Sequence, residues 1–197
     1  MINFAIIMVI VAIGMGIVWY VPLLRNGHAH PVPATFILAV AAFWIASASH
    51  LATPGIPLAK KLTGNITLFV STVQCTVILA VITYTYIKNG EWKVSFDRMQ
   101  KFCFVIMAVS LLYWFLNKDQ SMVTYWTVQV LMVVAYSATV VKILSRKQAF
   151  DSIGMWAMIT CASIFGFIPA IVTGSQYGIG NSIRSMVSSG LTAALFF

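Results

Sequence analysis

The chain has 197 residues, of which 60% are hydrophobic and 8% are charged. Soluble domains carry roughly 25% charged residues, so this composition excludes an ordinary water-soluble domain and indicates an integral membrane protein. The formal net charge is +8, but the Lys and Arg residues fall in short gaps between apolar runs, where they set orientation. The charge therefore does not indicate a nucleic-acid partner.

Seven apolar runs follow one another along the chain. They cover residues 2–24, 32–52, 66–88, 101–117, 122–144, 153–173 and 178–197. A helix that crosses a bilayer needs about 20 apolar residues, whereas a barrel strand needs about 10 with strict alternation. The runs are long and do not alternate, so they predict an all-α integral membrane protein with seven transmembrane helices. The first run lacks the features of a cleavable signal peptide and is predicted to be a span.

The basic residues predict the orientation. The gaps after the first, third and fifth runs hold eight Lys and Arg residues, and the gaps after the second, fourth and sixth hold three. Because cytoplasmic loops are enriched in Lys and Arg, the N-terminus is expected outside and the C-terminus in the cytoplasm. The predicted location is the cell membrane, with the lipid bilayer as a partner.

The fourth run is the shortest, and a highly charged gap precedes it. It is predicted to link two triplets of helices. Residues 1–88 would form the first three-helix repeat, 89–120 the linking helix and its loops, and 121–197 the second repeat. With one linking helix between them, both triplets run in the same direction across the membrane, as in a parallel repeat.

Both triplets carry the dipeptide Gly-Asn where the third helix is expected to begin, at Gly64-Asn65 and Gly180-Asn181. Thr76 and Thr192 match at the same offset. In each triplet a basic turn follows the first helix, and a gap rich in Gly and polar residues follows the second.

This 3+1+3 order, with an Asn opening the third helix of both triplets, resembles the SWEET sugar transporters and the wider PQ-loop group. Nicotinamide riboside transporters share this general fold. Residues 176–181 look like the SWEET segment around its second pocket Asn. The resemblance implies that Asn65 and Asn181 face each other across a central pocket, and that Trp44 stacks on the solute.

Polar residues recur at helical spacing in the third and seventh runs. One stripe holds Asn65, Thr72, Thr76 and Thr83, and the other holds Asn181, Arg184, Ser185, Ser188 and Thr192. Polar side chains are costly against lipid, so both stripes are expected to face inward. Two other interpretations stay open: N-capping for the Asn residues, and helix packing for the small Ser and Thr residues. Gln74 could contact solute or bond a neighbouring helix.

Charged residues within the runs are few. Arg184 could snorkel to the outer interface, or it could bind an anion or act in gating. The acidic residues all fall in gaps or at the ends of runs. Since ion-coupled carriers usually keep an acid within the membrane, facilitated diffusion is the expectation. His50 is expected to be a structural residue near the outer interface.

These observations predict a facilitative, alternating-access transporter for a small neutral polar solute, such as a sugar or a nucleoside-like vitamin precursor. The expected binding residues are Asn65, Asn181, Trp44, Thr72, Thr76, Gln74, Ser185 and Arg184. No catalytic set, cofactor motif or metal-ligand spacing occurs, so neither an enzyme nor a cofactor is expected. The alternative is a small non-transporting subunit of a larger membrane complex. A homo-oligomer or companion subunits are further expected partners.

Overall fold

The computed structural model describes residues 1–29, 31–146 and 153–194; for residues 118 and 135–146 it describes the backbone alone. All regular structure in these ranges is helical. The long helices are α1 (Ile2–Arg25), α2 (Pro33–Ala52), α4 (Ile66–Lys88), α5 (Arg98–Leu116), α6 (Ser121–Arg146), α7 (Ile153–Thr173) and α8 (Gln176–Ala194). A short helix, α3 (Leu58–Gly64), precedes α4, and a 3-10 turn, η1 (Lys118–Gln120), precedes α6.

The all-helical expectation is confirmed for the described residues. Within them, five helices are long and apolar enough to cross a membrane, namely α1, α2, α4, α5 and α7. The helices α4 and α7 coincide with the predicted runs 66–88 and 153–173. The last predicted run, 178–197, is shifted: α8 already begins at Gln176, and residues 195–197 lie outside the described residues.

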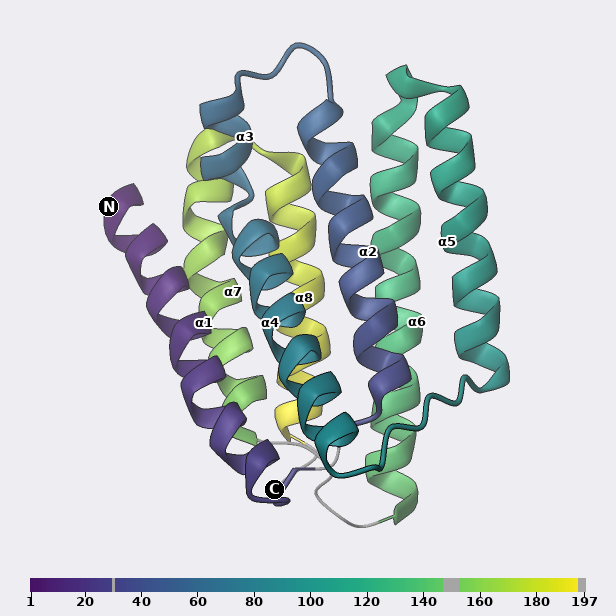
Figure 1. The fold of residues 1–197 in the computed structure, drawn as a ribbon. Coiled ribbons are helices and arrows are strands. Elements are labelled where there is room, and N and C mark those ends of the chain that lie inside the picture. Colours follow the sequence, from purple (N-terminus) through teal and green to yellow (C-terminus); the bar gives the residue numbers. More distant parts are fainter. Residues whose placement is uncertain (30, 147–152, 195–197) are drawn as a thin grey trace.

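Six of the long helices lie in two layers of three. In one layer α4 lies between α1 and α2, and in the other α8 lies between α6 and α7. Across the layers α1 contacts α7, α2 contacts α6, and α4 contacts α8 (Figure 1). The two middle helices therefore meet at the centre of the bundle. The helix α5 lies outside this arrangement, against α2 and α6.

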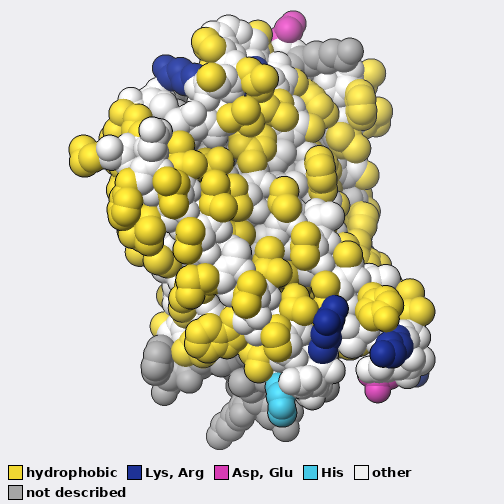
Figure 2. All heavy atoms as spheres, turned by 60° about the vertical axis from the view of Figure 1, so that its left-hand side comes forward, with side chains coloured by type: hydrophobic (Ala, Val, Ile, Leu, Met, Phe, Trp, Pro, Cys, Tyr) yellow, Lys and Arg dark blue, Asp and Glu magenta, His cyan; other side chains and the backbone are white. Residues whose placement is uncertain are grey.

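The outer faces of the bundle are apolar. Large hydrophobic side chains are exposed along the whole of α1, at Phe4, Ile7, Ile10, Val11, Met15, Val18 and Trp19. Figure 2 shows apolar side chains over the middle of one face, with charged side chains near its two ends. A surface of this kind suits the hydrocarbon core of a bilayer and would be unfavourable in water.

Local sequence signals explain where individual helices begin and end. Asp97 caps α5, because its Oδ1 accepts a hydrogen bond from the Gln100 backbone N–H at 2.8 Å and Gln100 Oε1 accepts one from the Asp97 N–H at 3.1 Å. This reciprocal pair is a capping box. At the end of α7, Gly174 adopts a φ of +64°, a conformation that glycine takes without steric cost. The turn at Gly174 leads directly into α8.

The short helix α3 was not expected, since residues 53–65 were assigned to a gap. It begins after Pro57 and ends at Gly64, and it packs against α7. Asn65 separates α3 from α4 with φ −135° and ψ 36°, so the chain changes direction at this residue. Gly64-Asn65 therefore directly precedes α4, the helix that matches the predicted run 66–88.

Gly180-Asn181 does not open its helix, and that prediction was wrong. Both residues lie within α8, which starts five positions before Asn181 at Gln176. The predicted start was late because Gln176, Tyr177 and the glycines that follow lower the apolarity of the segment. Tertiary packing compensates: Tyr177 and Gly178 are buried against the rest of the bundle.

Candidate functional site

A small cavity lies between the middle helices α4 and α8. It is lined by Phe43 of α2, by Ser71, Gln74 and Cys75 of α4, by Trp156 and Ile159 of α7, and by Arg184, Ser185, Ser188 and Ser189 of α8. We call this the seam cavity. Its volume is about 10 Å³, close to the room that one water molecule requires. Polar and aromatic side chains from both layers therefore meet around a nearly filled space.

The α8 wall of the seam cavity carries its charge. Arg184 Nη2 donates a hydrogen bond to Asn181 Oδ1 at 3.0 Å, and the guanidinium lies 5.7 Å from the centre of the Phe43 ring. A guanidinium only donates, so this bond fixes the orientation of the Asn181 amide. The remaining amide nitrogen, Asn181 Nδ2, is buried without an acceptor among the described residues.

The α4 wall contributes a buried amide. Gln74 is 1% exposed, and its Nε2 has no hydrogen-bond partner among the described residues. A Cβ on Gly16 of α1 would lie 3.1 Å from this nitrogen, so the glycine leaves room for the Gln74 side chain. A buried amide donor without a partner costs roughly 1–3 kcal/mol. Such a group at a cavity wall suits a bound water or a polar solute.

Asn65 belongs to a separate group of side chains, at the end of the bundle where α3 lies. Its Nδ2 donates to Tyr125 Oη at 3.2 Å, and Tyr125 Oη donates to the carbonyl oxygen of Tyr177 at 2.8 Å. Asn65 Oδ1 is buried without a partner among the described residues. The side chain does not cap α4, so the N-capping interpretation does not hold for Asn65.

His50 packs into the same group. Its ring centre lies 4.8 Å from that of Tyr177 and 6.0 Å from that of Tyr125. His50 Nε2 is 3.2 Å from the carbonyl oxygen of Lys61; since a carbonyl only accepts, this nitrogen carries the proton. Lys61 Nζ in turn donates to the Leu51 carbonyl. These contacts join α2, α3, α6 and α8 above the seam cavity.

Besides Asn65, three further predicted binding residues, Trp44, Thr72 and Thr76, lie away from the seam cavity. Trp44 is 55% exposed, and its Nε1 donates to Thr76 Oγ1 at 3.1 Å. Thr72 is buried where α2 meets α4, with its Oγ1 2.9 Å from Ser47 Oγ. Each of these residues holds α2 against α4. The exposed ring of Trp44 faces out of the bundle, which does not fit the stacking role implied by the resemblance.

Three other predicted residues, Gln74, Arg184 and Ser185, do line the seam cavity. Prediction from the sequence missed Phe43, Ser71 and Trp156. Ser71 could have been found, because it lies three residues before Gln74 on the same helical face. Ser189 is a packing residue as well as a lining one, since its Oγ lies 2.8 Å from Thr160 Oγ1 of α7.

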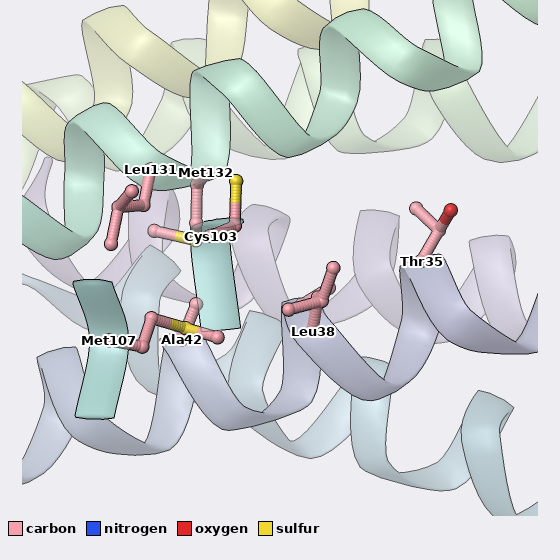
Figure 3. Close-up of a pocket in the computed structure, with 8 residues that line it drawn as sticks. Thr35, Leu38, Ala42, Cys103, Met107, Leu131 and Met132 are labelled. Atoms are coloured by element: carbon pink, nitrogen blue, oxygen red, sulfur yellow. The ribbon is translucent and has the colours of Figure 1, made fainter. Parts of the chain in front are cut away.

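A second cavity of about 10 Å³ lies between α2, α5 and α6 (Figure 3). Its lining is almost wholly apolar: Thr35, Leu38, Ala39, Ala42, Cys103, Met107, Leu131 and Met132. The one hydroxyl, Thr35 Oγ1, already accepts a hydrogen bond from Gln100 Nε2 at 3.1 Å. This lining offers a solute a single hydroxyl and no charge, so the seam cavity is the better candidate site.

We expect Tyr125→Phe to lower the free energy of unfolding by about 1–3 kcal/mol, because it removes a buried hydroxyl and leaves the Asn65 amide without its partner. Thermal unfolding followed by Trp fluorescence measures the change. Tyr84→Phe is the matched control, since Tyr84 is 62% exposed. Equal unfolding midpoints for Tyr125→Phe and the wild type would contradict the structural role of this hydroxyl.

Comparison of the chain with family models, with curated proteins and with solved structures gave no match. The resemblance to the SWEET and PQ-loop group therefore stays a prediction. Fold and site together define the class at a coarser level: a helical bundle in which five of the described helices are long and apolar enough to cross a membrane, with a small group of polar side chains and one arginine between two of its helices.

Proposed function

We propose that the chain is a multi-pass membrane protein in which α1, α2 and α4 form one three-helix repeat and α6, α7 and α8 form a second, parallel one, with α5 as the link. The packing order supports this proposal. The third helix of each triplet lies between the other two, and the cross-layer contacts α1 with α7 and α6 with α2 are equivalent under a two-fold axis. Such an axis relates parallel repeats in known transporters.

On this architecture the protein is a facilitative carrier for a small polar solute, such as a sugar or a nucleoside-like compound. The seam cavity is the observation that carries the proposal. It lies at the contact of the two middle helices, where each proposed repeat contributes polar groups, Gln74 from one and Arg184 with Ser185 from the other. Solute sites of repeat transporters lie at such repeat interfaces.

Transport requires the bundle to open. Ligand pockets span roughly 300–1,000 Å³, whereas the seam cavity holds about 10 Å³, so on this proposal the carrier must widen the cavity to admit a solute. The group formed by His50, Tyr125, Tyr177 and Asn65 closes one end of the path. We propose that this end faces outside, in keeping with the distribution of Lys and Arg, and that it separates when solute enters.

Uptake into proteoliposomes tests the proposal. Asn65→Ala combined with Asn181→Ala should reduce the rate by about tenfold or more, because two buried amides that meet the solute path are lost. Asn89→Ala, at an exposed helix end, is the matched control and should leave uptake unchanged. Unchanged uptake by the double variant would contradict the assignment of Asn65 and Asn181 to the solute path.

The alternative is the non-transporting subunit. It predicts no uptake of any solute by the purified wild-type chain across a panel of sugars, nucleosides and vitamins, together with stable companion proteins after mild solubilisation. A chain that is active alone in proteoliposomes excludes this alternative.

A further inference from the structure

The seam cavity offers hydrogen-bond donors and holds a positive charge. Its charged residue is Arg184, and its described lining contains no carboxylate. Gln74 Nε2 at the wall is a buried donor without a partner among the described residues, and so is Asn181 Nδ2 one turn before Ser185. These two buried amide nitrogens can only donate.

Two acceptors near the cavity are already engaged. Asn181 Oδ1 accepts from Arg184 at 3.0 Å. The Ser185 carbonyl accepts from Ser189 Oγ at 2.6 Å, and Ser189 Oγ also pairs with Thr160 Oγ1. The hydroxyls of Ser71, Ser185 and Ser188, which line the cavity, can accept as well as donate, so they would serve a neutral polyol or an anion. A carboxylate or a phosphate brings acceptors alone, and it pairs with a guanidinium in a strong, charge-assisted bond.

We propose that the solute of the seam cavity is a small organic anion, bearing one carboxylate or phosphate group that Arg184 binds with help from Gln74 and Asn181. The rings of Phe43 and Trp156, which line the same cavity, contact its uncharged part. This inference rests on the proposed function of the seam cavity and changes the expected charge of the solute from neutral to negative.

Matched pairs of probes test the charge of the solute. The purified full-length chain, in detergent and in buffer free of phosphate and sulfate, is titrated with a hexose, the corresponding hexuronate and the hexose 6-phosphate, and with a nucleoside and its 5′-monophosphate. We expect the anionic members to raise the unfolding temperature and the neutral members to leave it unchanged. Stabilisation by neutral members alone, or by none of the anions, overturns the inference.

Substitutions of Arg184 test whether this residue binds the anion. Arg184→Gln should weaken binding of the anionic probes by roughly 10- to 100-fold, the range for one charged hydrogen-bonding group. The affinity of Arg184→Lys for these probes should lie between those of Arg184→Gln and the wild type, because lysine keeps the charge but cannot form the two parallel hydrogen bonds of a guanidinium. Arg25→Gln, at an exposed helix end, is the control and should bind as the wild type does. Equal affinity of Arg184→Gln and the wild type overturns the assignment; if Arg184→Gln does not fold, the wild-type comparison of neutral and anionic probes decides.

Two further titrations distinguish a small organic anion from inorganic phosphate and from an anionic lipid headgroup. Inorganic phosphate alone should stabilise the chain less than the organic anions, and phosphatidylglycerol should not replace them. Full stabilisation by either one overturns the claim for an organic solute. Binding of an organic anion without uptake would refute the carrier function and would still support an anionic ligand. Uptake of neutral solutes alone would support the carrier function and would refute an anionic solute.

Discussion

Gly178→Ala should destabilise the bundle by about 3 kcal/mol or more, at or above the upper end of the usual range for overpacking. A Cβ on Gly178 would overlap the carbonyl oxygen of Gly64 and would lie 2.9 Å from the Cβ of Ala170. The carbonyl is part of the backbone at the junction of α3 and α4, so it cannot rotate aside as a side chain can. The added methyl group would therefore force α8 away from both the end of α3 and α7.

The measurement is unfolding of the purified chain in a titration with SDS, followed by Trp fluorescence. Gly14→Ala is the matched control: it lies within α1, and a Cβ there meets no heavy atom within 4 Å. Alanine is favoured over glycine in a helix by roughly 1 kcal/mol, so the control should be neutral or slightly stabilising. If Gly178→Ala unfolds at the same SDS concentration as the wild type, α8 does not pass this close to the α3–α4 junction.

Gly166→Ala should lower the free energy of unfolding by about 1–3 kcal/mol, again because the added methyl group overpacks a helix contact. A Cβ on Gly166 of α7 would overlap Thr67 Oγ1 of α4, a buried hydroxyl that has no hydrogen-bond partner among the described residues. Here the obstacle is a side-chain atom. The cost should therefore depend on the residue at position 67.

A double-mutant cycle checks this dependence. Thr67→Ala removes the obstructing hydroxyl, so the combination of Gly166→Ala and Thr67→Ala should unfold close to Thr67→Ala alone. The expected coupling lies within about 0.5–3 kcal/mol, the range for residues in direct contact. Additive losses would mean that α4 and α7 do not meet through these two residues.

The sequence predicted the bounds of α4 and α7 best. Runs 66–88 and 153–173 match these helices, because a long, mainly apolar segment without a charged residue before its last position has few alternatives to a helix that could cross a bilayer. The start of α8 was predicted late. Its first turns are rich in glycine and polar residues, and their burial depends on contacts that no local pattern contains.

The same limit applies to the side chains of the site. A stripe of polar residues on a helix shows that one face is distinct, and it does not show which neighbouring helix that face meets. Thr72 and Thr76 face α2, with bonds to Ser47 and Trp44, whereas Gln74 lies at the seam cavity. The sequence prediction assigned all three to one binding site, although Gln74 was not part of the stripe that holds Thr72 and Thr76. The packing of α4 places the two threonines and Gln74 at different contacts.

The sequence by itself determined that the chain is helical and that its helices suit a membrane. It showed amides and one arginine within the apolar runs and left open where their side chains lie. These properties follow from composition and from periodicity along one segment at a time. The tertiary structure alone decided that α4 and α8 meet at the centre, that Arg184 bonds Asn181 beside Gln74, and that Trp44 faces outward. These properties depend on contacts between segments far apart in the chain, made where small residues such as Gly64 and Gly178 allow close approach.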